Sequence, residues 1–290
     1  MSALTPEELR ELRRLHISAG RRVDSLFAGE YRSAVRGKGM EFEEVREYVP
    51  GDDVRHIDWN VTARTTEPHV KVFREERQTT VLLVIDLSGS VRVGSGGRDG
   101  RTSRRLQIAR IAGGLAYASI RNQDRVGLVS FTDHVETYLP PRKNRGHVWA
   151  VIRAAFATAG TQRGTNLADA LQFVQSVQRR RAVIVVVSDF LDDGEFLQRL
   201  GPLARRHQLH AVVVHGPFDE AFPAIGLTEV VDAETGQRML VDGAAFLARQ
   251  SLDERTKQLR RRGAKVATIS TEEDPYAALM SHFHREGHRR

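Results

Sequence analysis

Short β-branched segments alternate with longer segments of helical periodicity from Thr79 onward, and this alternation most constrains the fold. The segments predicted to be strands are Val81–Ile85, Ala182–Val187, His210–Val214 and Lys265–Ile269. The segments predicted to be helices are Leu106–Ile120, Val148–Phe156, Leu167–Val177, Gly194–Arg205, with Asp192 or Asp193 as its cap, and Ala244–Arg262. Strands that alternate with such helices form parallel sheets covered on both faces, so we predict a doubly wound, mainly parallel α/β sheet over residues 79–290.

Two neighbouring segments break the alternation, Val126–Phe131 and Val135–Leu139, which are separated by a short turn. They predict a β-hairpin attached to the parallel sheet. A further short extended segment is expected at Leu227–Val231.

Residues 1–78 differ in pattern and are expected to form an N-terminal helix-plus-strand extension. A first helix is predicted after Thr5, with Pro6 in its first turn and Glu8 at capping-box spacing. Short strands are expected at Glu41–Tyr48 and His69–Phe73, and Trp59 is expected to anchor the segment in an apolar pocket.

Acidic and basic residues are interleaved in this extension. They are Glu41, Asp52, Asp53 and Asp58, with Arg46, Arg55 and Arg64. One interpretation is an acid site like that of a metal nuclease. The other, which the Pro50-Gly51-Asp52 turn signal favours, is a network of ion pairs and turns.

Oxygen-bearing side chains follow the predicted strands of the main domain at three places. Asp86, Ser88 and Ser90 come directly after the strand Val81–Ile85, at alternate positions of one loop. Thr165 precedes a predicted helix, and Asp189 follows the strand Ala182–Val187. Because ligands of open α/β sheets bind at the carboxyl ends of the strands, these three loops are expected to meet. Carboxylate and hydroxyl oxygens suit Mg²⁺, or Mn²⁺ or Ca²⁺, so the pattern predicts a divalent-cation site.

These five residues resemble the metal-ion-dependent adhesion site of von Willebrand factor type A domains. The resemblance implies that Ser88, Ser90 and Thr165 contact the ion directly. It implies that Asp86 and Asp189 act mainly through water or as outer ligands. It also implies a site that binds a partner's carboxylate and catalyses nothing.

The upstream segment resembles the signature of the domain of unknown function 58 family. The matching upstream stretches are Gly37–Phe42, Arg46–Trp59 and Ala63-Arg64. The C-terminal stretches Asp232–Gly236 and Ser270-Thr271 also resemble this family. The resemblance implies a von Willebrand factor type A-like (Rossmann-like) fold. It also implies a partnership with a MoxR-type AAA+ ATPase, in the assembly or maturation of an unknown client protein.

Two other functions remain open from the residues. A Mg²⁺-dependent hydrolase, either a phosphatase or a nuclease, would use Asp86 or the acids of the extension, although Ser88 stands where aspartyl-phosphate enzymes carry a second aspartate. A nucleic-acid binder would use the net charge of +7. We read the arginines, Arg104 and Arg105 among them, as solvated helix faces. No nucleic acid is therefore expected as a partner.

The remaining expectations concern chemistry and location. The chain has no cysteine, and it contains no Walker A string. Met1–Leu9 has no apolar core of a signal peptide, and the longest apolar runs are strand-sized, so a cytoplasmic protein without a membrane anchor is expected. His282 and His284 are expected to be solvated, and His134 and His215 to be surface or turn residues.

Overall fold

The computed structural model describes residues 10, 40–75, 79–90, 104–156, 164–192, 195–220, 226–231, 237–242 and 251–288. The chain divides into two compact units, one of Arg36–Thr79 and one of Met1–Val35 with Thr80–Arg290. The predicted first helix, apart from Arg10, lies outside the described residues. The predicted division into 1–78 and 79–290 stays a prediction, because it concerns that N-terminal segment.

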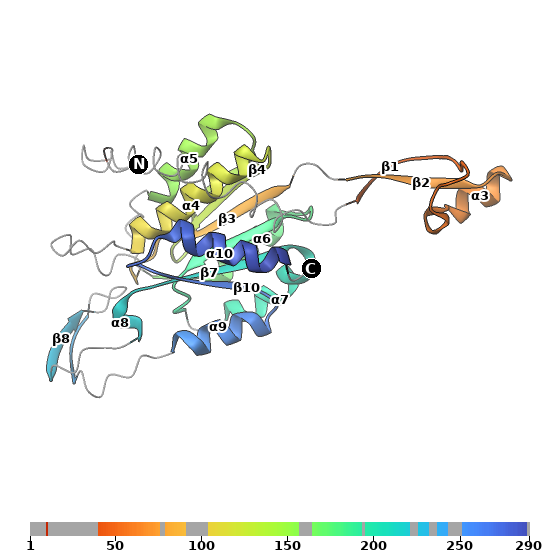
Figure 1. Cartoon of the computed structure of the whole chain (residues 1–290). Coiled ribbons are helices and arrows are strands. Elements are labelled where there is room, and N and C mark those ends of the chain that lie inside the picture. Colours follow the sequence, from red (N-terminus) through yellow and green to blue (C-terminus); the bar gives the residue numbers. More distant parts are fainter. Residues whose placement is uncertain are drawn as a thin grey trace. The chain divides into compact units, whose positions relative to one another are not determined.

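The smaller unit is an antiparallel pair of strands whose connection carries two short helices (Figure 1). The strands are β1 (Met40–Glu47) and β2 (His69–Glu75), which confirms the two predicted strands. The connection contains the 3₁₀ helix η1 (Val54–His56) and the helix α3 (Trp59–Thr65), which was not predicted. Asp58 is the N-cap of α3, because its carboxylate accepts hydrogen bonds from the backbone N–H groups of Asn60 and Val61.

The acidic residues of this unit pair with its basic residues. Arg46 lies 2.7 Å from Asp52 and donates to both carboxylate oxygens, and this hydrogen bonding lowers the pKa of Asp52 to about 2. The other pairs are Arg55 with Asp53 at 3.0 Å and Lys71 with Asp58 at 3.3 Å. These contacts support the ion-pair interpretation.

Trp59 is 69% exposed, so the predicted apolar pocket for its indole is wrong. The physical reason is local. It is the first residue of α3, a helix with no buried residue, so the described part of this unit offers the indole no apolar core.

The larger unit is built on a six-stranded sheet with the order β10-β7-β6-β3-β4-β5. The strands are β3 (Thr80–Asp86), β4 (Arg125–Phe131), β5 (Val135–Arg142), β6 (Val183–Ser188), β7 (Gln208–His215) and β10 (Lys265–Ser270). All neighbours are parallel except β4 and β5, which form the predicted hairpin. The predicted doubly wound, mainly parallel fold is confirmed.

Helices cover both faces of this sheet (Figure 1). One face carries α4 (Arg104–Arg121), α5 (Arg145–Phe156) and α10 (Pro275–His288). The other carries α6 (Leu167–Val177), α7 (Phe196–Arg206) and α9 (Leu252–Arg261). The unit also contains the short helix α8 (Pro217–Glu220) and a separate hairpin of β8 (Leu227–Val231) and β9 (Arg238–Asp242). Among the described helices, none is long and apolar enough to cross a membrane.

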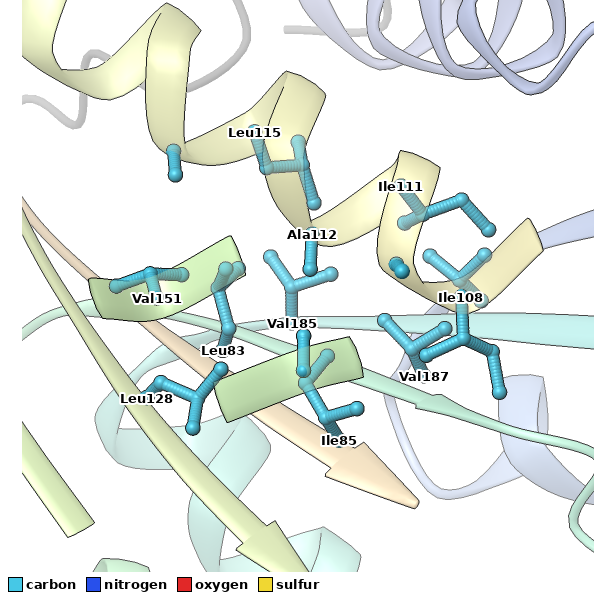
Figure 2. Packing of buried hydrophobic residues seen from close by; sticks show 14 of the residues in the cluster. Leu83, Ile85, Ile108, Ile111, Ala112, Leu115, Leu128, Val151, Val185 and Val187 are labelled. Carbon is cyan, nitrogen blue, oxygen red and sulfur yellow. The ribbon is translucent and has the colours of Figure 1, made fainter. Parts of the chain in front are cut away.

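Alternation along β3 shows why this sequence becomes a central strand. Leu83 and Ile85 pack under α4 in one cluster (Figure 2), whereas Leu82 and Val84 belong to the cluster on the opposite face. All four side chains are fully buried, as expected for a parallel strand covered on both sides. Burial of each such side chain stabilises the fold by roughly 1.5–3 kcal/mol.

Two local predictions need correction. Asp192 does not cap α7, because its carboxylate accepts the backbone N–H of Leu167 at 2.9 Å; Asp193 lies outside the described residues. The predicted helix Ala244–Arg262 does not run through Ser251, because Ser251 is the N-cap of α9 and the helix begins at Leu252; residues 244–250 lie outside the described residues. The predicted end at Gly263 is confirmed, and the φ of 88° at this position favours glycine.

Two histidine predictions are also wrong. His282 is 1% exposed because it packs on His210 and Phe283, and its Nε2 lies 2.8 Å from His210 Nδ1. His215, the last residue of β7, is buried as well. His134 and His284 are exposed as expected.

The order in which strands are added to the sheet reverses direction between β3 and β6. From β3 the chain runs outward to β4 and β5, and it returns to β6 before continuing to β7 and β10 in the other direction. The helices α4 and α7 that follow β3 and β6 therefore lie on opposite faces. Such a switch point opens a crevice at the carboxyl ends of the strands, where ligands of these sheets bind.

Candidate metal centre

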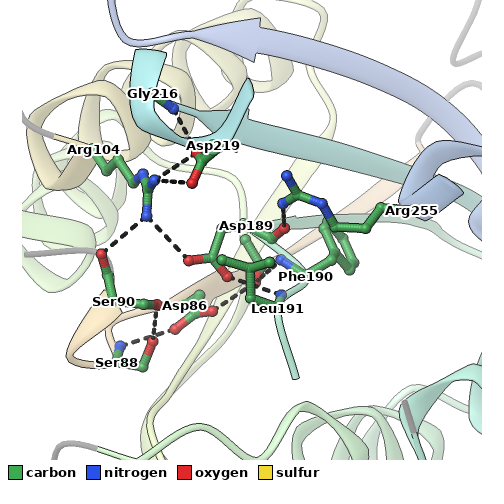
Figure 3. Close-up of polar contacts among 11 residues, drawn as sticks. Asp86, Ser88, Ser90, Arg104, Asp189, Phe190, Leu191, Gly216, Asp219 and Arg255 are labelled. Atoms are coloured by element: carbon green, nitrogen blue, oxygen red, sulfur yellow. Dashed lines mark hydrogen bonds and ion pairs between the residues drawn. The ribbon is translucent and has the colours of Figure 1, made fainter. Parts of the chain in front are cut away.

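Asp86 is the last residue of β3, and the register of the sheet sets its neighbour. Ile85 pairs with Val187, which brings Asp86 beside Ser188 at the end of β6. Asp86 Oδ2 accepts a hydrogen bond of 2.6 Å from the Ser188 hydroxyl, and Oδ1 accepts the Ser88 backbone N–H at 2.9 Å (Figure 3). The carboxylate is fully buried and is held by neutral donors.

The electrostatics of Asp86 favour a cation nearby. Burial, followed by the charge of Asp189, raises the pKa of Asp86 to about 7, and the bonds from Ser188 and Ser88 only partly offset this. No basic side chain pairs with Asp86 among the residues that the structure describes. A buried carboxylate of this kind gains most from a positive charge beside it.

Ser88 and Ser90 present their hydroxyl groups on the loop after β3. The two oxygens are 3.1 Å apart, and Ser88 is fully buried while Ser90 is partly exposed. The loop is fixed at its start, because Leu87 donates its backbone N–H to the Phe131 carbonyl of β4 at 2.9 Å. This arrangement supplies two hard oxygen ligands next to a carboxylate.

Asp189 follows β6 and is also buried, at 2% exposure. Its Oδ1 accepts the backbone N–H of Leu191 at 3.1 Å, and its Oδ2 lies 3.4 Å from Arg104 Nη1. Its carbonyl oxygen accepts a hydrogen bond of 2.5 Å from Arg255 Nη1 (Figure 3). The second carboxylate of the site is therefore held from both its side chain and its backbone.

Thr165 is half-buried in the loop that enters α6. The next two residues anchor this loop to the segments that follow β4 and β6. Asn166 donates its backbone N–H to the Thr132 carbonyl after β4 at 2.8 Å, and Leu167 donates to Asp192, three residues after Asp189. Thr165 thus belongs to a loop fixed to both neighbouring strand ends.

The donor set fits a hard divalent cation. Three loops together supply two buried carboxylates and three hydroxyl groups, and the set contains no sulfur or imidazole. In the described part of the chain, no three histidine, aspartate or glutamate side chains are grouped so that they could hold a metal ion. Any ion here would therefore rely on hydroxyl oxygens as well. Asp86, Ser88 and Ser90 are joined by hydrogen bonds, and Asp189 interacts electrostatically with Asp86. Thr165 lies in the third loop, which the bonds of Asn166 and Leu167 hold to Thr132 and Asp192.

Sequence reasoning missed four residues around this site. They are Ser188, Arg104, Asp219 and Arg255. Arg104 was expected on a solvated helix face, and this is wrong, since it is buried with 7% exposure. Arg105 is also partly buried, with its guanidinium 4.6 Å from the centre of the Phe156 ring. A signal was available only for Asp219, an acidic residue shortly after the carboxyl end of β7.

Arg255 of α9 is 2% exposed, and its Nε and Nη2 have no hydrogen-bond partner within the described ranges. Burial lowers the pKa of this guanidinium, with opposing contributions from Asp219 and Asp189. The hydrogen bond of its Nη1 to the Asp189 carbonyl thus fixes the loop after β6 (Figure 3).

The strand order and the helices on both faces together define the class of protein, a doubly wound α/β domain with a mainly parallel sheet. The chain belongs to the family described as Protein of unknown function DUF58, whose model matches residues 44–262. It is 30% identical over 284 residues to the uncharacterized protein Rv1480 of Mycobacterium tuberculosis, an alignment that covers 95% of this chain and 88% of the relative.

Two solved structures have a similar fold. BatB from Bacteroides thetaiotaomicron matches with a TM-score of 0.51 at 14% identity, covering 72% of this chain and 99% of that chain. An aerotolerance-related membrane protein from Bacteroides fragilis matches with a TM-score of 0.52 at 16% identity, covering 73% and 100%. At these identities the likeness concerns the fold alone.

Proposed function

We propose that this protein is a non-enzymatic, Mg²⁺-dependent protein-binding domain. Its ion would be held by Asp86, Ser88, Ser90, Thr165 and Asp189. The bound cation would supply an open coordination position for a carboxylate of a partner protein. The residues of the chain hold the loops in place, exclude water from Asp86 and keep the two carboxylates close together.

The observation that carries this proposal is the environment of Asp86. Its carboxylate is fully buried beside a second buried carboxylate, Asp189, and receives only neutral hydrogen-bond donors. Two like charges in a buried site are unfavourable unless a cation or a proton compensates them. The hydroxyl groups of Ser88 and Ser90 beside them are ligands for a hard cation and are poorly suited to acid–base work at neutral pH.

The rim of the site supports a protein as the ligand. Leu191, two residues after Asp189, is 44% exposed although it is a large apolar side chain. An exposed apolar side chain beside a metal site favours a protein as the partner, because apolar area contributes to binding when water leaves it.

We further propose a MoxR-type AAA+ ATPase as the partner, acting on an unknown client protein in the cytoplasm. This rests on membership of the DUF58 family together with the absence of a Walker A string in the chain itself. The domain would then present a client to the ATPase or report its binding.

Capture of the purified ATPase on the immobilised full chain tests the proposal. Retention should require Mg²⁺, fall on addition of EDTA, and be lost in the Asp86→Ala and Ser88→Ala variants. Asp253→Asn is a matched control, because it removes an exposed carboxylate from the first turn of α9 and should retain the partner. Equal retention with EDTA and in both site variants would rule out the metal-dependent mechanism.

A hydrolase remains the alternative from another class. It predicts Mg²⁺-dependent turnover of a phosphate ester or nucleic acid that Asp86→Ala abolishes. A nucleic-acid binder predicts retention of DNA or RNA that falls steeply as salt rises. Neither result is expected from a site of this kind.

A further inference from the structure

Arg104 connects the candidate ligands to a third strand end. Its Nη1 donates to the Ser90 carbonyl at 3.2 Å and lies 3.4 Å from Asp189 Oδ2. Its Nη2 lies 2.5 Å from each carboxylate oxygen of Asp219, in α8 beyond β7 (Figure 3). One buried guanidinium therefore touches the loops after β3, β6 and β7.

The distances rank these contacts. Charge-assisted N–H···O bonds are typically about 2.7–2.9 Å long, so the contact with Asp219 is tight and that with Asp189 is loose. Asp219 is itself fixed, because its Oδ2 accepts the Gly216 backbone N–H at 2.7 Å and its own N–H donates to the Gly216 carbonyl. Arg104 is thus held mainly by Asp219, at a position where its charge still acts on Asp189.

We propose that Arg104 is a built-in counter-cation that competes with the divalent ion for Asp189, and that Asp219 restrains this competition. The inference rests on the proposed metal site. When Asp219 holds the guanidinium, Arg104 makes only the long contact of 3.4 Å with Asp189 Oδ2, and this oxygen can still face the ion. When Asp219 releases it, Arg104 moves fully onto Asp189 and lowers the affinity for the cation.

Through Asp219 and Arg104, the position of α8 would affect the affinity of the site for the cation. Any protein or ligand that displaces Asp219 would weaken cation binding, and cation binding would in turn favour the Arg104–Asp219 pair, since coupling between two sites is reciprocal. Arg104 is a positioning residue in this scheme, because it acts through Asp189 and does not itself hold the ion.

Opposite effects of two substitutions test the proposal. Arg104→Gln removes the competing charge and should tighten Mn²⁺ binding roughly ten-fold, because a nearby unit charge in a partly buried site is weakly screened. Asp219→Asn weakens the grip on Arg104 and should loosen Mn²⁺ binding several-fold. The effect of Asp219→Asn should be smaller in the Arg104→Gln background. Free Mn²⁺ measured by electron paramagnetic resonance on the full chain gives each affinity.

Two further variants separate charge from structure. Arg104→Lys keeps the charge and should stay closer to the wild-type affinity than Arg104→Gln does. Arg105→Gln is the matched control. Its guanidinium donates to the Phe156 carbonyl and packs on the Phe156 ring, so this variant should leave Mn²⁺ affinity within about two-fold. Thermal melting of each variant establishes that it is folded.

The outcomes are distinct for the two proposals. Binding that Asp86→Ala abolishes but Arg104→Gln leaves unchanged or weakens would overturn the role of Arg104 while keeping the metal site. Equal tightening by Arg104→Lys and Arg104→Gln would overturn it as well. Mn²⁺ binding that appears only after Arg104→Gln would support the competition directly. If neither the wild type nor the Arg104→Gln variant binds Mn²⁺, the proposed metal site itself is wrong.

Discussion

The Ser188 hydroxyl donates a hydrogen bond of 2.6 Å to Asp86 Oδ2 and so joins the ends of the two central strands, β6 and β3. The same hydroxyl accepts the Phe190 backbone N–H at 3.0 Å. Because Ser188 is 1% exposed, this group orients the buried carboxylate and the first turn of the loop that carries Asp189.

Ser188→Ala should therefore both destabilise the fold and disturb the site. Loss of a hydrogen bond to a buried charged group costs about 1.5–3 kcal/mol of unfolding free energy. Urea denaturation measures this loss. Ser130→Ala is a matched control, because Ser130 is a buried serine of β4 whose hydroxyl has no hydrogen-bond partner in the described part of the structure. Equal stability losses in the two variants would contradict the orienting role of Ser188.

The buried histidine His282 predicts a pH dependence of stability. Burial lowers the pKa of His282 to about 4 from its ordinary value of 6.5. The unfolded chain therefore binds this proton more readily, so stability is fully present above pH 6.5 and is lost as the pH falls toward 4. Between pH 7 and pH 5 the contribution of this group is about 2 kcal/mol.

Denaturation at pH 7 and pH 5 in wild type and His282→Gln checks this. The variant should lose less stability on acidification than the wild type. His284→Gln, on the exposed side of the same helix, should behave like the wild type. An identical acid sensitivity in all three proteins would show that His282 does not titrate in this way.

Close approach of α10 to α4 makes Gly114 sensitive to substitution. A Cβ atom at this position would lie 2.8 Å from Cε1 of the Tyr276 ring, which is closer than side chains approach. Gly114→Ala should destabilise the protein by about 1–3 kcal/mol despite the better helix propensity of alanine. Gly146→Ala in α5 is the control, since its nearest contact would be 3.6 Å away. A gain in melting temperature for Gly114→Ala would mean that α10 adjusts without cost.

Regular elements could be predicted where local pattern and tertiary burial agree. The run Val183–Val187 reads as a strand because it is β-branched, and it remains one because both of its faces are covered. The positions of Asp86 and Asp189 could be predicted for the same reason, since Asp86 ends such a strand and Asp189 directly follows one.

Contacts between distant parts of the chain could not be predicted. Arg104 is buried because it pairs with Asp219, which lies 115 residues further along the chain. His282 is buried because its ring packs on His210, which lies 72 residues earlier. Asp192 was predicted to cap α7, but its carboxylate accepts the backbone N–H of Leu167 instead. In each case a polar residue found a partner that the local sequence does not contain.

Calorimetric titration of Mg²⁺ into the full chain tests whether the strand-end residues hold a cation. We expect binding of one ion per chain in the wild type, lost in Asp86→Ala and in Ser88→Ala, and kept in Asp253→Asn. Saturation at about a hundred times the dissociation constant should also stabilise the wild type by about 2.7 kcal/mol. If the wild type binds no Mg²⁺, or if the Asp86→Ala and Ser88→Ala variants bind it as the wild type does, these residues do not form a Mg²⁺ site.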